Sequence, residues 1–320
     1  MQPKFSESVL EAYGAASASL ARAEVRVSLC PNKPALLAQI RLREREALAR
    51  LEGEDIIPEN LAAEYGHSPR AWKHWPHAFV QVFDKPLSGR ALPNAEAVRR
   101  WLHEPRPLSP LPASRVPVEI YEDRLKAWEK RCAPARHQAA LFAAPDLAAQ
   151  FVRTAPLTRG NIVIATMLAD RVATGPNGFS AGGIAAIGII AREIPWVRLL
   201  NGRDDEEADD LLPPGQTVQV RLAWLDALAQ GGTAVVEIAQ RLSLWQQVLE
   251  DTCAGKRRTS HLRALAQLAV EHHSLTASRA AQLLKISRQG ATLLLEEACS
   301  RHVLREVTRG NAFRRYVASI

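Results

Sequence analysis

Apolar residues recur at helical spacing along most of this sequence, whereas signals for β-strands are scarce until its final residues. The spacing predicts helices at 6–29, 35–51, 121–132, 139–152 and 218–249. A composition of 47% hydrophobic and 23% charged residues is typical of a soluble globular chain. It excludes wholesale disorder, collagen and a disulfide-stapled mini-protein. The 320 residues therefore predict a mainly α fold of two or three domains.

A proline-rich stretch divides the helical part of the chain. Five prolines fall within residues 104–117, and this density forbids a helix and favours an extended linker. We therefore expect an N-terminal helical region at 1–103, a linker at 104–117, a central helical domain at 118–255 and a C-terminal domain at 256–320.

The sequence contains no pattern that predicts a metal, a cofactor or a membrane span. The four cysteines lack C-x-x-C spacing, which favours a reducing cytoplasm, and no window reaches eighteen uncharged apolar residues. His74 and His77 have no third ligand nearby, and the acidic run at 204–210 lacks the spacing of a calcium loop. We interpret the histidines as packing residues and the acidic run as a solvated loop. A glycine-rich patch at 178–188 lacks nucleotide-binding spacing and is also interpreted as a loop.

The positive charge of the chain is concentrated at its C-terminal end. Residues 256–320 contain twelve Lys and Arg but four Glu, a net charge of +8, whereas the whole chain carries +7. The first 255 residues are therefore close to neutral, at −1. Such asymmetry predicts that a small domain meets a polyanion, most commonly nucleic acid. A basic solvated tail without a partner is the alternative.

The basic segment has the layout of a winged helix-turn-helix. Its apolar spacing predicts helices at 260–271, 277–284 and 288–300, with a tight turn between the second and the third. Thr276 and Ser287 are placed to cap the second and third helices. Period-two segments at 303–307 and 312–318 then predict a hairpin, which would form the wing.

The third helix would read the major groove of DNA. We expect it to bury Ala291, Leu294, Leu295 and Ala298. Arginine bonds guanine bidentately and glutamine bonds adenine, and each pair contributes ~1–3 kcal/mol of discrimination. The outward residues near its start would supply these contacts, two cations of the second helix would meet phosphates, and wing arginines would meet the backbone or the minor groove. The expected DNA-binding residues are Arg279, Lys285, Ser287, Arg288, Gln289, Thr292, Arg309, Arg314 and Arg315.

Two short segments resemble an uncharacterised rhizobial, often plasmid-borne, family. The run 304–310 (LREVTRG) after a helix-turn-helix is similar to the end of that family's proteins, and the run 41–56 (RLREREALARLEGEDI) is similar to their N-terminal part. Members pair a domain of unknown function with a C-terminal helix-turn-helix. The resemblance implies a DNA-binding regulator without an established reaction.

The central region resembles a degenerate core of the Fic family of adenylyl transferases, whose signature is H-P-F-x-(D/E)-G-N-G-R-x-x-R. Within residues 155–166, Pro156, Gly160 and Asn161 match this signature. In that family the histidine is the base for the target hydroxyl, the acid holds a metal, the Gly-Asn-Gly backbone cradles phosphates and the arginines bind phosphate. A chance match of three residues is the alternative.

The chain departs from the Fic signature wherever a side chain would perform chemistry. Ala155 stands at the position of the base, Arg159 at that of the acid, and Val163 and Thr166 at those of the two arginines. Without a general base, a metal ligand and phosphate-binding arginines, these positions cannot support adenylyl transfer by the Fic mechanism. The segment 48–53 similarly resembles the family's inhibitory (S/T)xxxE(G/N) element but lacks its hydroxyl. We therefore expect no transferase activity.

These observations predict a mainly α protein with helical N-terminal and central domains of degenerate Fic-like fold and a C-terminal winged helix-turn-helix. We expect a sequence-specific binder of double-stranded DNA, a cytoplasmic, nucleoid-associated transcriptional regulator with no catalytic residues, cofactor or metal. The helical body would serve dimerisation, partner binding or effector sensing. A Fic-type transferase with a non-standard nucleotide site and a helix-turn-helix adaptor for an acidic protein are the alternatives.

Overall fold

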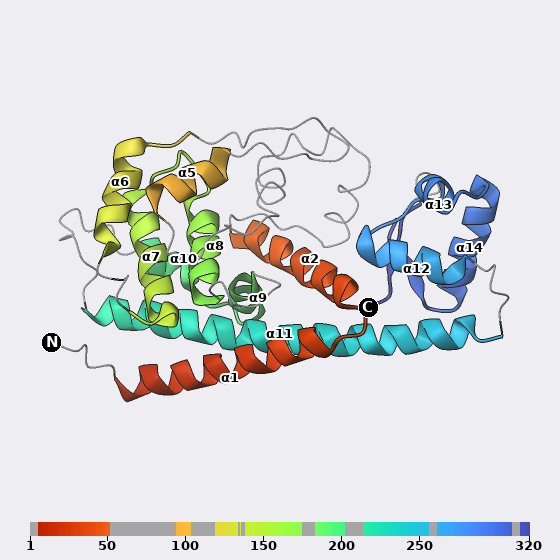
Figure 1. The fold of residues 1–320 in the computed structure, drawn as a ribbon, viewed down its shortest axis with the longest axis horizontal. Helices are drawn as coiled ribbons and strands as arrows, with labels where there is room; N and C mark the ends of the chain where they lie inside the picture. The colour runs from red at the N-terminus through yellow and green to blue at the C-terminus, as the bar shows by residue number, and fades with distance from the viewer. Residues whose placement is uncertain are drawn as a thin grey trace. The chain divides into compact units, whose positions relative to one another are not determined.

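The computed structural model describes residues 6–51, 94–103, 119–133, 135, 138–174, 183–201, 214–255, 261–308 and 314–320. This described part is mainly helical, as the sequence predicts (Figure 1). Its elements are α1 (Glu7–Leu29), α2 (Lys33–Leu51), α5 (Ala95–His103), α6 (Glu122–Arg131), α7 (Ala140–Thr154), α8 (Asn161–Thr174), α9 (Ile184–Ala191), α10 (Trp196–Asn201), α11 (Pro214–Cys253), α12 (Leu262–Glu271), α13 (Ala277–Leu284), α14 (Arg288–Ser300), β1 (Leu304–Glu306) and β2 (Tyr316–Ala318).

The chain divides into two compact units, each assembled from discontinuous segments. Unit 1 holds the described residues within 1–24, 47–55 and 73–234, and unit 2 holds those within 25–46 and 235–320. Helices α1, α2 and α11 therefore contribute residues to both units. This division differs from the predicted boundaries, which follow the order of the sequence.

Several predicted features lie outside the described residues. They are the proline-rich segment 104–117, the histidine pair His74 and His77, and the acidic run 204–210. Among the helices that the structure describes, none is long and apolar enough to cross a membrane.

Helices α7 and α8 form the centre of unit 1 and lie side by side (Figure 1). Helix α6 packs on α7 through Trp128, whose ring meets Phe151 edge-on with 5.4 Å between ring centroids. The indole Nε1 of Trp128 donates a hydrogen bond to the carbonyl oxygen of Leu147 at 3.1 Å, so its polar atom is satisfied although the side chain is fully buried. The apolar spacing predicts α7, but it does not identify α8.

Residues 178–182 of the glycine-rich patch lie outside the described residues, and the prediction of a loop is wrong for Gly188. Gly188 lies inside α9, at a place where this helix meets α11 through backbone. A Cβ atom at Gly188 would lie 1.9 Å from the carbonyl oxygen of Ala227, and one at Gly231 would lie 2.0 Å from that of Ile184. Only glycine permits this approach, so the two glycines allow a close helix contact.

Helices α1 and α11 also approach closely within unit 1. The hydroxyl of the buried Ser19 donates a hydrogen bond to the carbonyl oxygen of Ala229 at 2.6 Å. A Cβ atom at Gly232 would lie 2.5 Å from that hydroxyl oxygen. A small side chain on α1 and a glycine on α11 therefore let the two helices pack with little space between them.

Unit 2 contains the three helices and the hairpin predicted for the C-terminal segment. The bounds of α13 and α14 agree with the predicted ones, and α12 begins near the predicted start. The strands pair antiparallel, with Leu304 opposite Ala318 and Glu306 opposite Tyr316, but they are shorter than predicted. Trp245 of α11 joins this core, because its buried indole donates to the carbonyl oxygen of Val303 at 2.7 Å.

Candidate nucleic-acid interface

The turn between α13 and α14 is fixed by caps and by one residue in the left-handed region. The hydroxyl oxygen of Thr276 accepts from the backbone N–H of Arg279, and α13 begins there. Lys285 ends the helix with a φ of 55°, and the backbone N–H of Ile286 then donates to the carbonyl oxygen of Ala281. Ser287 starts α14 in the same way as Thr276 starts α13. Both predicted caps are confirmed.

Helix α14 has one face in the core and one in solvent. Ala291, Leu295 and Ala298 are fully buried, as predicted, whereas Leu294 is half-buried rather than buried. Arg288 and Gln289, in the first turn, are both exposed. The expected reading residues at the start of the helix therefore point away from the core.

The hydroxyl of Thr292 is used in a hydrogen bond within α14 and is not free to contact a base. Its side chain is half-buried, and its hydroxyl donates to the carbonyl oxygen of Arg288 at 3.0 Å, one turn earlier in the helix. Ser287 likewise uses its hydroxyl oxygen to accept from the backbone N–H of Gly290 at 3.0 Å. Both hydroxyls thus hold the first turn of α14 while lying next to its exposed residues.

The hairpin is tied to the helices through β2. Leu275, just before α13, exchanges two backbone hydrogen bonds with Tyr316, at 2.8 and 2.9 Å. Tyr316 is also paired with Glu306 of β1, so this isolated antiparallel bridge adds Leu275 at the other edge of β2. Apolar alternation predicts the hairpin, but it carries no signal for the bridge, because Leu275 precedes the hairpin by about thirty residues.

The two cations expected to meet phosphates lie on or just after α13. Lys285 is exposed, and the guanidinium of Arg279 donates to the side-chain oxygen of Gln282 at 2.8 Å. Nearby, burial and then the charge of Arg279 lower the pKa of His272 below its usual value. The neutral imidazole is therefore favoured beside this cation.

The wing arginines differ in their surroundings. Arg314 lies 3.9 Å from a carboxylate oxygen of Glu296 on α14 and 3.7 Å from one of Glu306 on β1. The guanidinium therefore links the hairpin to the outer side of α14. Arg315 is half-buried, with its backbone N–H donating to the hydroxyl of Thr308. Arg309 lies outside the described residues.

The loop that resembles the Fic signature connects α7 to α8 in unit 1. It opens at Ala155 with a φ of 42° and closes at Gly160 with a φ of 76°. The amide of Asn161 accepts from the backbone N–H of Leu157 and donates to its carbonyl oxygen, at 3.1 and 2.9 Å. Thr158 exchanges further bonds with the backbone of Glu119. The side chain of Asn161 therefore bridges the start of α8 to Leu157 in the loop before it and stabilises the conformation of this loop.

Two positions that correspond to phosphate-binding arginines in the Fic signature face the core. Val163 and Thr166 on α8 are fully buried. The hydroxyl of Thr166 accepts from the indole of Trp196 at 3.0 Å and donates to the carbonyl oxygen of Ile162. These side chains serve packing in unit 1.

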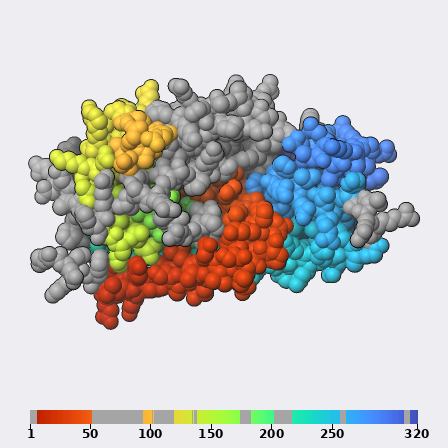
Figure 2. Space-filling model, viewed as in Figure 1, coloured from red at the N-terminus to blue at the C-terminus, as the bar shows by residue number. Residues whose placement is uncertain are grey.

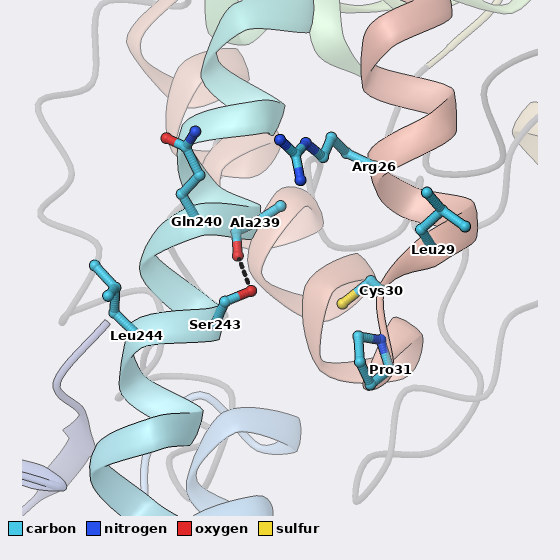
Figure 3. Close-up of a pocket in the computed structure, with 8 residues that line it drawn as sticks. All are labelled: Arg26, Leu29, Cys30, Pro31, Ala239, Gln240, Ser243 and Leu244. Atoms are coloured by element: carbon cyan, nitrogen blue, oxygen red, sulfur yellow. Dashed lines mark hydrogen bonds between the residues drawn. The ribbon is translucent and has the colours of Figure 1, made fainter.

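A pocket of about 440 Å³ lies within unit 2, between the end of α1 and the C-terminal part of α11 (Figure 3). Its lining is Arg26, Leu29, Cys30, Pro31, Ala239, Gln240, Ser243 and Leu244. It has no carboxylate or histidine, and among the described residues no group of three potential metal ligands occurs. The titratable side chains of the pocket lining are those of Arg26 and Cys30.

Comparisons with known proteins give no family for the chain. No protein-family model matches it, and no curated protein matches it. Among solved structures, a Fic family protein from Desulfovibrio desulfuricans G20 is similar with a TM-score of 0.46 and 14% identity, over 99% of this chain and 98% of that chain. The resemblance to the rhizobial family gains no support from these comparisons.

Proposed function

We propose that the chain binds double-stranded DNA in a sequence-specific manner through residues 261–320 and acts as a transcriptional regulator on the nucleoid. The observation that carries the proposal is the two-sided character of α14. Arg288 and Gln289 are exposed in its first turn, while Ala291 and Leu295 anchor its other face in the core. A helix held in this way presents its N-terminal side chains to a groove without losing its own packing.

The chemistry of the exposed residues fits base recognition. The guanidinium of Arg288 can donate two hydrogen bonds to guanine, and the amide of Gln289 can both donate to and accept from adenine. The caps at Thr276 and Ser287 fix the turn between α13 and α14. The side chains of Arg288 and Gln289 would therefore be held on a rigid backbone when they enter the groove.

The charge around α14 fits the phosphate backbone. Lys285 is exposed next to its first turn, and Arg279 lies on the preceding helix. Arg314, held between two glutamates, would keep the hairpin in place beside α14 and orient it toward the duplex. Phosphate contacts of this kind set the register of a reading helix, and they release counterions on binding.

The test is duplex binding by the full chain after selection of bound fragments from a random pool. Arg288→Ala/Gln289→Ala is expected to abolish the preference for the selected sequence and to weaken binding by ~10- to 100-fold. The matched control is Arg22→Ala/Gln267→Ala, which removes an exposed arginine of α1 and an exposed glutamine of α12 and leaves α14 unchanged. If the double variant prefers the selected sequence as the wild type does, the proposed reading residues are wrong.

A transferase of Fic type is the second candidate, favoured by the loop before α8. This loop keeps Gly160 at positive φ and Asn161 at the start of a helix, the residue types that the signature requires there. The amide of Asn161 is engaged by Leu157, which argues against a free nucleotide cradle. Incubation with labelled ATP tests this candidate: label on the protein or on a partner that is lost in Asn161→Ala would support it.

A helix-turn-helix can also serve as a protein-interaction module, so a basic adaptor for an acidic protein is the third candidate. Competition separates it from DNA binding. If an acidic partner is found and unrelated duplex DNA does not displace it, the basic surface of 261–320 serves that partner instead.

A further inference from the structure

The C-terminal part of α11 carries a second apolar stripe on its outer side. Within unit 2, Leu242, Trp245 and Leu249 are buried and form the inner side of this helix. Leu244 and Val248, by contrast, have 63% and 40% of their surface exposed. The helix therefore has apolar residues on a side that its own core does not use.

Charged residues flank the outer apolar pair at coiled-coil spacing. Arg241, Leu244, Val248 and Asp251 follow one another at intervals of three, four and three residues, and all four are exposed. This spacing places them along one line of the helix surface. We call these four residues the outer seam. The C-terminal part of α11, cyan in Figure 2, reaches the surface on the face shown there.

Two copies of the outer seam that run antiparallel are complementary to each other. Its spacing is the same in both directions, the apolar residues are central, and the two ends have opposite charge. In an antiparallel pair, Leu244 meets Val248 of the second copy and Arg241 meets Asp251 of the second copy. A parallel pair would place arginine against arginine and aspartate against aspartate, which is unfavourable.

We propose that the outer seam is the self-association surface of this protein, formed by two copies of α11 packed antiparallel about a two-fold axis. The partner is a second copy of this chain, because charge complementarity selects the reversed seam itself. The exposed Leu29 of α1 lines the same pocket as Leu244, on the opposite side of the pocket from α11 (Figure 3). A two-fold interface of this kind is isologous, so each contact occurs twice.

The seam is short, so the dimer is weak. Specific interfaces bury roughly 1,600 Å² in total, and four residues on one helix with a neighbouring leucine supply a fraction of this area. We therefore expect a dissociation constant in the range of ~1–100 μM, measurable as a monomer–dimer equilibrium. The proposal does not depend on DNA binding, although a dimer would carry two copies of α14.

Sedimentation equilibrium of the full chain over a concentration series tests the proposal. The wild type is expected to shift from monomer to dimer, and Leu244→Glu is expected to remain monomeric throughout. Leu10→Glu is the matched control, since Leu10 is an exposed leucine of α1 in unit 1 with 53% of its surface accessible. It should dimerise like the wild type. Circular dichroism of each variant confirms that the helices are intact.

Charge reversal tests the antiparallel register. Arg241→Glu alone and Asp251→Arg alone each place like charges together twice, and each should raise the dissociation constant by ~10-fold or more. The double variant restores both pairs in reversed form and should dimerise like the wild type. An equimolar mixture of the two single variants should also dimerise, because both cross-pairs are then attractive.

Three results would overturn the proposal. If the wild type stays monomeric at every concentration, the outer seam does not bind a second copy of the chain and would instead be a surface for a different partner. A Leu244→Glu variant that dimerises normally places the interface elsewhere. Single charge reversals without effect, or a double variant weaker than both, would exclude the antiparallel register.

Discussion

Gly188→Ala should destabilise unit 1 because α9 and α11 touch through backbone at this position. The added Cβ would lie 1.9 Å from the carbonyl oxygen of Ala227 and 2.8 Å from the backbone nitrogen of Gly231. Neither neighbour is the end of a flexible side chain, so the clash is relieved by moving one helix. A separation of about 1 Å would loosen the packed contacts along both helices.

The magnitude follows from two opposing effects. Alanine in place of glycine inside a helix contributes ~1 kcal/mol to stability through its higher helix propensity. Overpacking costs ~1–3 kcal/mol, and more where rigid backbone is the obstacle. Ile184, Ala227 and Leu228 are buried around this contact and would lose part of their packing. Because rigid backbone places the cost at the upper end of this range or above it, we expect a net loss of about 2 kcal/mol or more in the free energy of unfolding of unit 1.

Urea unfolding followed by circular dichroism measures this loss, with Gly14→Ala as the control. Gly14 is exposed in α1, and a Cβ there would meet no heavy atom within 4 Å. The control should therefore stabilise the protein by ~0.5–1 kcal/mol. If Gly188→Ala is neutral, or stabilises as Gly14→Ala does, the close contact between α9 and α11 is wrong.

Three further predictions concern unit 2. Trp245→Phe removes the indole donor to the buried carbonyl oxygen of Val303 and should cost ~1–3 kcal/mol in urea unfolding; a loss below ~0.5 kcal/mol would refute this anchor. Ser287→Ala removes the cap of α14 and should cost ~0.5–2 kcal/mol, whereas Ser278→Ala, at an exposed serine of α13, should cost less; equal losses would argue against the cap. The pKa of His272 is lowered by burial, so the folded state binds fewer protons than the unfolded state as the pH falls through about 6.5. The contribution of His272 to the free energy of unfolding is full above that pH and is lost as the pH falls toward the lower pKa of the folded state. His272→Gln should therefore flatten the dependence of unfolding free energy on pH in this range. An unchanged dependence would contradict the lowered pKa of His272.

The C-terminal segment was predictable because its signals are local. Caps such as Thr276 and Ser287 act within a few residues, and apolar spacing defines a buried face on each short helix. The bounds of α13 and α14 therefore agree with the structure. The exposed positions of Arg288 and Gln289 follow from the same spacing.

The missed features depend on contacts between distant segments. Helix α8 is apolar on nearly all sides because it lies in the centre of unit 1, so periodicity alone does not distinguish it from a strand or a loop. Gly188 resembles a loop glycine until the backbone of Ala227 is known to lie against it. The pairing of Arg314 with Glu296 spans the hairpin and α14, and charge counting treats that arginine as a free cation.

The outer seam illustrates a signal that the sequence does contain. The 3-4-3 spacing from Arg241 to Asp251 is visible in the printed residues, but apolar spacing alone does not separate a buried face of this helix from an exposed one. The structure assigns Trp245 and Leu249 to the core, and this assignment separates the inner side from the outer one. The exposed apolar residues Leu244 and Val248 thereby become distinguishable from the core residues of the same helix.

The salt dependence of duplex binding by the full chain is the sharpest test of whether residues 261–320 bind DNA. Lys285 and Arg279 are the two cations on or just after α13 that we expect to meet phosphates, and two phosphate contacts would give a slope of log affinity against log salt of about −2. We expect this linear fall for the selected duplex, and a shallower slope for Lys285→Ala. Absence of duplex binding at low salt, or an affinity that does not change with salt, would contradict it.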